Sequence, residues 1–436
     1  MNARATLLSA LVAGLILGAL YGWTVGPTIG VLHGTVDSAE LVSVAAVLGV
    51  AHPSGEALWL PLARLALGVV PAAEPALRTN LLSVVLMALA GALVSVAACR
   101  WRPETPWWGA ASTGLFFGLA PVVWAQATVT EVYALEAVLA ALALVLGADA
   151  SRGRHWRVFA FVLGLLVASH LTGLALAFPI LVAALAGSRG PRGRETAWCA
   201  GLFLLPMAYS VAYLWLRADA AIAWGDTGSL RGLSDHFLGA TYRDALERSP
   251  RMVASAVPET VRNALGQLPP PAWLLLIPGA FAVARTRGAL ALVLGVWFAL
   301  LTVFISAYPV SGREDYLQGT TMALALFAGW GVVSAWDWAT QRLRDRGARA
   351  ALGLVAVGLF GLWAVWVGHD VSRRGDTTLV KEARAALAGV PEDGRVDTFD
   401  DRQTFPLWYV TTVLHEREDV TVVDVRQVAP RVGPRP

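Results

Sequence analysis

The chain has 436 residues, of which 56% are hydrophobic and 15% are charged. Soluble domains carry about 25% charged residues, so this composition excludes an ordinary soluble globule and indicates a polytopic membrane protein. The formal net charge of +3 gives no reason to expect nucleic acid as a partner. The lipid bilayer is therefore the first partner that we expect.

Apolar stretches of about 20 residues are long enough to cross a bilayer as helices. Hydropathy predicts an all-α bundle with about eleven such crossings. Arg4 precedes the first, but the run is long enough to span and no small-residue cleavage site follows it, so we expect a span and not a cleaved signal. The predicted crossings are residues 5–24, 78–98, 107–125, 131–149, 157–170, 172–187, 196–216, 271–284, 288–307, 318–336 and 350–368.

The loops between these crossings alternate in charge. Arginines gather near residues 100–102, 152–157, 189–194, 285–287 and 342–349, whereas the intervening loops are more acidic. Positively charged loops stay on the cytoplasmic side of a membrane. The N-terminus is therefore predicted to be cytoplasmic, and the acidic loops and the C-terminus to be extracytoplasmic.

Two loops and the tail are too long to be simple connectors. Within a predicted transmembrane domain of residues 1–370, extracytoplasmic loops cover 25–77 and 217–270, and the first should hold interfacial helices at 37–50 and 55–70. Residues 371–436 are predicted to form a small α/β extracytoplasmic segment, with a helix at 377–389 and strands near 395–399 and 420–425. A segment of about 60 residues is too small for a robust core, so we expect it to pack on the extracytoplasmic loops.

The first extracytoplasmic loop carries the most informative cluster of charged residues. Asp37 and Glu40 lie three residues apart, so on a helix they share a face and can point into one cleft. The sequence Ala51-His-Pro-Ser-Gly then redirects the backbone a few turns later. Ionisable groups beside the hydrocarbon layer usually mark a functional site. The alternatives are that Glu40 only solvates an interfacial helix and that His52 only braces the turn.

A series of motifs in chain order resembles a known family. It resembles the transmembrane protein O-mannosyltransferase-like family of membrane glycosyltransferases with the GT-C fold, widespread in bacteria. The chain differs from the usual family pattern at Ala39 and Ser54 and has a shorter motif at 313–316. The motifs are Asp37-Ser-Ala-Glu-Leu, Leu48-Gly-Val-Ala-His-Pro-Ser-Gly, Arg78-Thr-Asn-Leu-Leu-Ser, Val129-Thr-Glu-Val-Tyr133, Ser169-His170, Trp224-Gly-Asp-Thr, Phe237-Leu-Gly-Ala-Thr-Tyr-Arg243, Arg313-Glu-Asp-Tyr316 and Asp400-Asp-Arg-Gln-Thr-Phe-Pro-Leu-Trp-Tyr409.

The resemblance implies transfer of a sugar from a polyprenyl-phosphate donor to an acceptor protein or glycan at the outer face of a bacterial inner membrane. The acceptor hydroxyl must lose a proton, and we expect Asp37 to be the general base, with Glu40 and His52 beside it. Arg313 is the first choice for the donor phosphate because arginine suits phosphate geometry. The other residues expected to bind phosphate or substrate are His170, Arg78, Arg243, Glu131, Tyr133, Trp224, Asp226 and Tyr316.

No cofactor is predicted from the sequence. It has no nucleotide-binding glycine loop, which a lipid-linked donor would not need, and no Cys/His spacing typical of zinc. A divalent cation held by Asp37, Glu40 and Asp226 is a less favoured alternative. Two other functions stay open at this point, a transporter or flippase of lipid-linked sugars and a non-catalytic membrane protein in envelope assembly.

Overall fold

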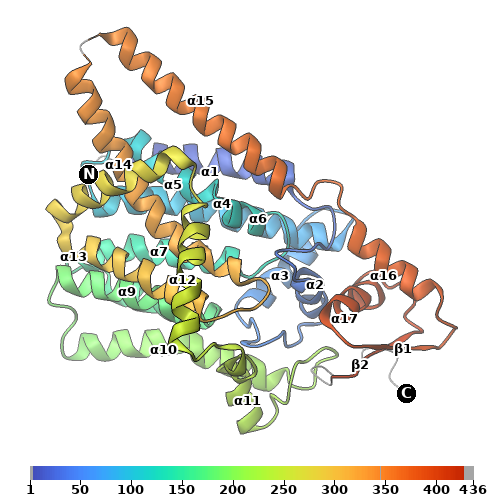
Figure 1. Ribbon diagram of the computed structural model, residues 1–436. Coiled ribbons are helices and arrows are strands. Elements are labelled where there is room, and N and C mark those ends of the chain that lie inside the picture. Colours follow the sequence, from blue (N-terminus) through green and yellow to red (C-terminus); the bar gives the residue numbers. More distant parts are fainter. Residues whose placement is uncertain (1–2, 344, 427–436) are drawn as a thin grey trace.

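The computed structural model describes residues 3–343 and 345–426 and consists mainly of helices. Long helices lie side by side in a bundle, and shorter elements gather at one end of it, at the right of Figure 1. The bundle contains α1 (Ala3–Thr24), α4 (Pro75–Trp101), α5 (Trp107–Gly118), α6 (Pro121–Ala127), α7 (Tyr133–Ala150), α8 (Trp156–Ser169), α9 (Gly173–Gly187), α10 (Arg194–Leu216), α13 (Trp273–Ser306), α14 (Leu317–Arg342) and α15 (Arg346–Val371).

The predicted fold class is confirmed, but fewer helices than expected are long enough to span a membrane. In the described ranges seven helical segments are long and apolar enough, and an eighth is added if α5 and α6, bent by 72°, form one broken span. The predicted crossings 157–170 and 172–187 are the shorter helices α8 and α9, separated by the extended residue His170. Those at 271–284 and 288–307 are the two parts of α13, which is kinked at Arg287.

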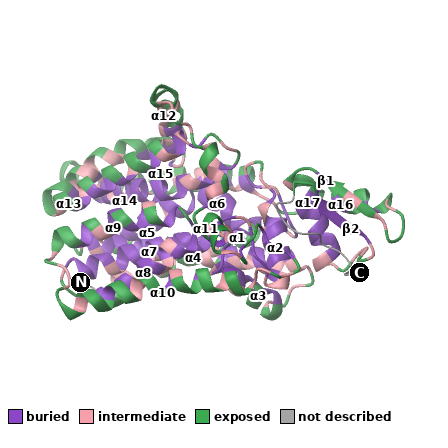
Figure 2. Ribbon diagram, turned by 90° about the horizontal axis from the view of Figure 1, so that it is seen from below, coloured by how far each residue is buried: buried purple, intermediate pink, exposed green. Residues whose placement is uncertain are grey.

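Burial follows position in the bundle. Helices α7 and α14 are mostly buried inside the protein, whereas α10 and α15 are mostly exposed, as Figure 2 shows. Small residues let the central helices approach closely. A Cβ atom at Gly279 of α13 would lie only 1.8 Å from the carbonyl oxygen of Phe327 in α14. The apolar outer faces of α10 and α15 are suited to contact lipid.

The first long loop forms two short helices. They are α2 (Asp37–Val47) and α3 (Trp59–Val69), close to the predicted 37–50 and 55–70. Leu48 adopts a left-handed conformation and ends α2. Val50 then pairs with Ala223, which ties the turn around His52 to the second long loop. That loop contains α11 (Leu230–Phe237), the 3-10 helix η1 (Ala240–Ala245), α12 (Pro250–Leu265) and η2 (Pro270–Ala272).

The predicted helix and two strands of the tail are present, together with two further helical elements, and the tail packs on the first long loop. It contains α16 (Thr378–Ala388), α17 (Asp401–Trp408), the π-helix η4 (Tyr409–Val413) and two parallel strands, β1 (Arg395–Thr398) and β2 (Thr421–Asp424). The Tyr409 hydroxyl donates to the Glu74 carboxylate and accepts the Ala76 backbone N–H at 3.2 Å. The last part of the predicted segment, 427–436, lies outside the described residues.

The Tyr409 contacts predict a stability effect. Tyr409→Phe removes a buried hydroxyl that two polar groups use. The Glu74 carboxylate keeps the Thr28 hydroxyl at 2.6 Å, but the Ala76 backbone N–H loses its partner, at a cost of about 1–3 kcal/mol. The variant should therefore have a lower melting temperature in detergent than the parent protein. Tyr209→Phe, at a 44% exposed residue in α10, is the matched control. Equal melting temperatures for all three proteins would show that this contact does not hold the tail.

Candidate active site

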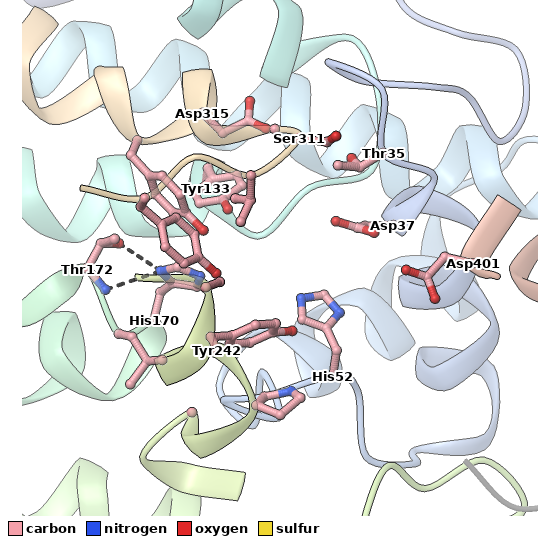
Figure 3. A pocket seen from close by; sticks show the side chains of 18 of the residues that line it. Thr35, Asp37, His52, Tyr133, His170, Thr172, Tyr242, Ser311, Asp315 and Asp401 are labelled. Carbon is pink, nitrogen blue, oxygen red and sulfur yellow. Dashed lines mark hydrogen bonds between the residues drawn. The ribbon is translucent and has the colours of Figure 1, made fainter. Parts of the chain in front are cut away.

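A cavity of about 650 Å³ lies where the short elements meet the end of the bundle. Its wall comes from segments that are far apart in the sequence, and Figure 3 shows their side chains around one open space. The contributing elements are the start of α2, the turn at His52, the start of α7, the connection between α8 and α9, the 238–246 segment, the end of α13 with η3 (Arg313–Tyr316), and the start of α17.

Asp37 is the first residue of α2 and faces this cavity. Burial raises the pKa of its carboxyl to about 6, His52 opposes that rise, and Glu40 adds to it. Asp401 of α17 lines the cavity on the same side as Asp37, as Figure 3 shows. Asp37 is therefore a carboxylate that is ionised at neutral pH and can accept a proton as the pH falls toward 6.

Glu40 does not line the cavity, contrary to the expectation that both carboxylates point into one cleft. Its side chain is fully buried and turns toward the His52 turn. The backbone N–H of His52 donates to Oε1 of Glu40 at 2.8 Å, and Nδ1 of His52 lies 2.5 Å from Oε2. Helical spacing placed Glu40 beside Asp37 correctly, but it could not show that His52 would occupy its oxygens.

Glu56 is a buried acidic residue that the sequence did not single out as a site. Its backbone is left-handed (φ 50°), and it follows Gly55, also at positive φ. Neither of its carboxyl oxygens has a hydrogen-bond partner among the described residues. Burial raises the pKa of Glu56 to about 8, so the group is protonated at neutral pH.

Aromatic side chains cover the wall opposite the acidic residues. The ring centroids of Tyr133 and Tyr316 lie 6.0 Å apart, and Tyr308 and Phe304 lie 5.8 and 5.6 Å from Tyr316. Tyr242 completes this aromatic wall, and in Figure 3 its hydroxyl points toward His52. Aromatic rings with polar ends offer both an apolar face and hydrogen bonds, which suits a ligand such as a sugar.

His170 also lines the cavity, next to Tyr133. Its Nδ1 lies 2.7 Å from the Thr172 hydroxyl oxygen, and that hydroxyl donates to the Glu136 carboxylate. Burial lowers the pKa of His170 to about 3, and the charge of His52 adds to this effect. The imidazole of His170 is therefore neutral at pH 7 and is not the cation that a phosphate partner was expected to be.

The structure brings together seven of the twelve residues expected at the site. Those that line the cavity are Asp37, His52, Tyr133, His170, Trp224, Arg243 and Tyr316. Glu131 is buried in the connection between α6 and α7 but does not line the cavity. Burial raises the pKa of its carboxyl, and the negative charge of Asp37 raises it further. The remaining four residues, among them Glu40, point elsewhere.

Three expected residues have structural contacts outside the cavity. Arg313 forms an ion pair with Glu259 of α12 at 3.3 Å, so it is not directed at the cavity that its neighbours Gly312 and Asp315 line. Arg78 donates to the backbone carbonyls of Leu67 and Ala72 and ties the end of α3 to α4. Asp226 is exposed and accepts the Ser229 hydroxyl at 2.6 Å.

The sequence reasoning missed several lining residues. Asp315 accepts a hydrogen bond from Gln126 at 3.0 Å and lies 2.7 Å from Nδ1 of His33. It belongs to the motif at 313–316, which was the available signal. Asp401 and Arg402, which belong to the motif at 400–409, also line the cavity. Across residues 3–343 and 345–426, no three His, Cys, Asp or Glu side chains are grouped so that they could hold a metal ion.

The arrangement of long helices with a cavity at one end is a GT-C fold. ArnT from Cupriavidus metallidurans bound to undecaprenyl phosphate superposes with a TM-score of 0.61 at 16% identity, covering 95% of this chain and 90% of that one. The oligosaccharyltransferase of Archaeoglobus fulgidus in its apo form gives a TM-score of 0.56 at 11% identity, over 98% of this chain and 65% of that one. At these identities the likeness shows the shared fold.

The resemblance inferred from the motifs is confirmed by a family match. Residues 37–190 match the model of the protein O-mannosyl-transferase TMEM260 N-terminal domain. The mouse protein O-mannosyl-transferase TMEM260 is 23% identical over 417 residues, which is 89% of this chain. That alignment covers 59% of the mouse protein, so this chain spans a little over half of its relative.

The unpaired Glu56 carboxyl predicts a pH-dependent stability. The pKa of Glu56 is about 8 in the folded protein and 4.5 in the unfolded chain, so the folded protein binds this proton more tightly. The free energy of unfolding is therefore highest below pH 4.5 and decreases as the pH rises toward 8. Glu56→Gln removes this loss and should stabilise the protein at pH 8 by about 3–5 kcal/mol. The melting-temperature difference from the parent protein should be much smaller at pH 4.5. A difference that does not change with pH would contradict a raised pKa.

Proposed function

We propose that this protein transfers a sugar from a polyprenyl-phosphate donor to an acceptor hydroxyl, with Asp37 as general base. The observation that carries the proposal is a cavity lined both by the polar side chains of Asp37 and His52 and by apolar side chains that reach the surface. These apolar lining residues are Leu171, Leu238 and Leu246, which are 41%, 53% and 37% exposed. A lipid-linked sugar needs this combination, because its polyprenyl chain prefers apolar surroundings and its reacting end is polar.

The comparisons support the same class of reaction. The mouse relative is named a protein O-mannosyl-transferase, and one structural neighbour is bound to undecaprenyl phosphate. By analogy, the donor here carries its sugar on a polyprenyl phosphate, and the acceptor is a protein or glycan hydroxyl. Fold likeness alone would not carry this assignment, because one fold supports many functions.

Asp37 is suited to the proton transfer that the reaction requires. As the acceptor oxygen bonds to the anomeric carbon, the bond from that carbon to the phosphate oxygen breaks and the acceptor proton passes to Asp37. Positive charge develops at the anomeric carbon in such transition states, and a nearby carboxylate stabilises it. The aromatic wall of Tyr133, Tyr242 and Tyr316 would hold the sugar from the other side.

The reaction would take place on the extracytoplasmic side of a bacterial inner membrane. Arg100 and Arg154 pair with Asp149 at the ends of α4 and α7 that lie away from the cavity. Arginines of this kind stay in the cytoplasm, which supports an outward-facing cavity. The protein is multi-pass, and this orientation has the N-terminus inside and the tail outside.

Asp37→Asn tests the base directly. The variant should lose transfer about 10²–10⁴-fold, since that is the usual contribution of a positioned base. The assay is release of free polyprenyl phosphate from polyprenyl-phosphate mannose, with envelope fractions of a strain lacking the gene as acceptor. Asp235→Asn, at an exposed residue of α11, is the control. Full transfer by folded Asp37→Asn would exclude the base role, and lipid movement without phosphate release would indicate a transporter instead.

The pH dependence of the rate provides a second test. Because the base acts only when it is deprotonated, and the pKa of Asp37 is raised to about 6, transfer should decline as pH falls below about 6. The decline should approach tenfold for each pH unit. An ordinary exposed aspartate would maintain the rate down to about pH 4, so a profile that is flat from pH 7 to 4.5 would contradict the assignment.

A further inference from the structure

Glu40 is the buried charged residue that the proposed mechanism leaves without a task. Both of its carboxylate oxygens are used by one residue, through the His52 backbone N–H at 2.8 Å and the His52 ring Nδ1 at 2.5 Å. One carboxylate thus fixes both the position of the turn and the orientation of the ring. An isolated buried carboxylate is unfavourable, so Glu40 is stable there only while His52 partners it.

This contact determines what the His52 ring presents to the cavity. With Nδ1 directed at Glu40, Nε2 is the ring nitrogen left for a ligand. The His52 side chain is 18% exposed and lines the cavity, whereas that of Glu40 is 0% exposed. Trp224 packs edge-on against the ring, with centroids 6.3 Å apart. The ring is therefore held on two sides and open on the side of the cavity.

The surroundings keep His52 charged. Burial by itself lowers the pKa of the imidazole, but the field and hydrogen bond of Glu40 and the field of Asp37 outweigh it, so the pKa lies well above 6.5. His52 therefore presents an imidazolium at neutral pH. The titratable groups that face it from the surrounding elements are Asp37 and Glu40 of α2, Glu56 before α3, Glu131 before α7, His170 before α9 and His236 of α11.

The other basic residues considered for a phosphate are less suitable. Arg313 pairs with Glu259, Arg78 binds backbone carbonyls, and His170 is neutral. Arg243 and Arg402 line the cavity, but Arg243 is exposed and Arg402 pairs with Glu382 at 3.6 Å. Among the lining residues in the described part of the chain, His52 is thus the cation held in place beside Asp37.

We propose that Nε2–H of His52 binds the phosphate of the lipid-linked donor and that Glu40 is the positioning residue that holds His52 for this task; the proposal rests on the function proposed above. As the bond between the anomeric carbon and the phosphate oxygen breaks, its electron pair stays on the phosphate. The polyprenyl phosphate then carries one more negative charge, which His52 stabilises, while the acceptor proton is on Asp37.

The test measures binding of undecaprenyl phosphate, without a sugar, to the full-length protein in detergent. His52→Gln should weaken binding at pH 7.5 at least tenfold. Glu40→Gln removes the main partner of the imidazole and so lowers the pKa of His52. When the pH is raised from 7 to 10, the variant should therefore lose binding at a pH at least one unit lower than the parent protein does. The second ionisation of a phosphate monoester lies near pH 6, so the charge of the probe is constant over this range.

Two controls separate positioning from general damage. His415→Gln and Glu418→Gln alter an exposed histidine–carboxylate pair in the tail, 2.5 Å apart, and should bind the probe as the parent protein does. Glu40→Asp keeps the charge and should restore part of the pH range that Glu40→Gln loses. Melting temperatures establish which variants are folded, and His52→Gln decides the question if Glu40→Gln does not fold.

The outcomes distinguish this proposal from the function on which it rests. Parent-like binding by folded His52→Gln, or an unchanged pH range in folded Glu40→Gln, would overturn the phosphate assignment alone. Asp37→Asn should still bind undecaprenyl phosphate although it no longer transfers sugar. A parent protein that does not bind undecaprenyl phosphate at any pH would overturn both proposals.

Discussion

The contact between Glu40 and His52 is the interaction on which the candidate site depends. It joins the buried face of α2 to the turn that precedes α3, and it determines which way two polar residues point. Without a partner, neither a buried carboxylate nor a buried imidazolium would be stable so close to apolar helices. Because Glu40 is occupied by His52, Asp37 is left as the carboxylate of α2 that faces the cavity.

The same turn is held from outside by two segments distant in sequence. Val50 pairs with Ala223 of the second long loop, and Trp224 of that loop contacts both His52 and Phe405 of the tail. The tail is anchored in turn by Tyr409 at the start of α4. The cavity wall is therefore built from membrane helices, both long loops and the tail, and damage to one of these contacts would be transmitted to the His52 ring.

Periodicity and motif order predicted much of the fold and part of the site. The bundle, both interfacial helices and the elements of the tail follow from local patterns, because apolar length and turn residues determine them. Asp37 was expected at the site from its spacing to Glu40, and Tyr133 from the motif at 129–133, and both line the cavity. Arg313 was expected at the site but lies outside the cavity lining, where it pairs with Glu259 of another helix, 54 residues away. The spacing of residues along a helix shows which side chains share a face, but it does not show which side chains of other segments they will pair with.

Several strained or unpaired groups lie near the same turn. Glu56 has a left-handed backbone and an unpaired carboxyl, and the ring nitrogens Nε1 of Trp224 and Nε2 of His236 lack partners among the described residues. A sequence selected for stability alone would replace such groups, because each buried unpaired polar atom costs about 1–3 kcal/mol. Such groups are common at functional sites, which fits a turn that is shaped by what it binds. An imidazolium held in advance by Glu40 needs no reorganisation when an anionic ligand arrives, and such preorganised charge is what stabilises a developing negative charge most effectively.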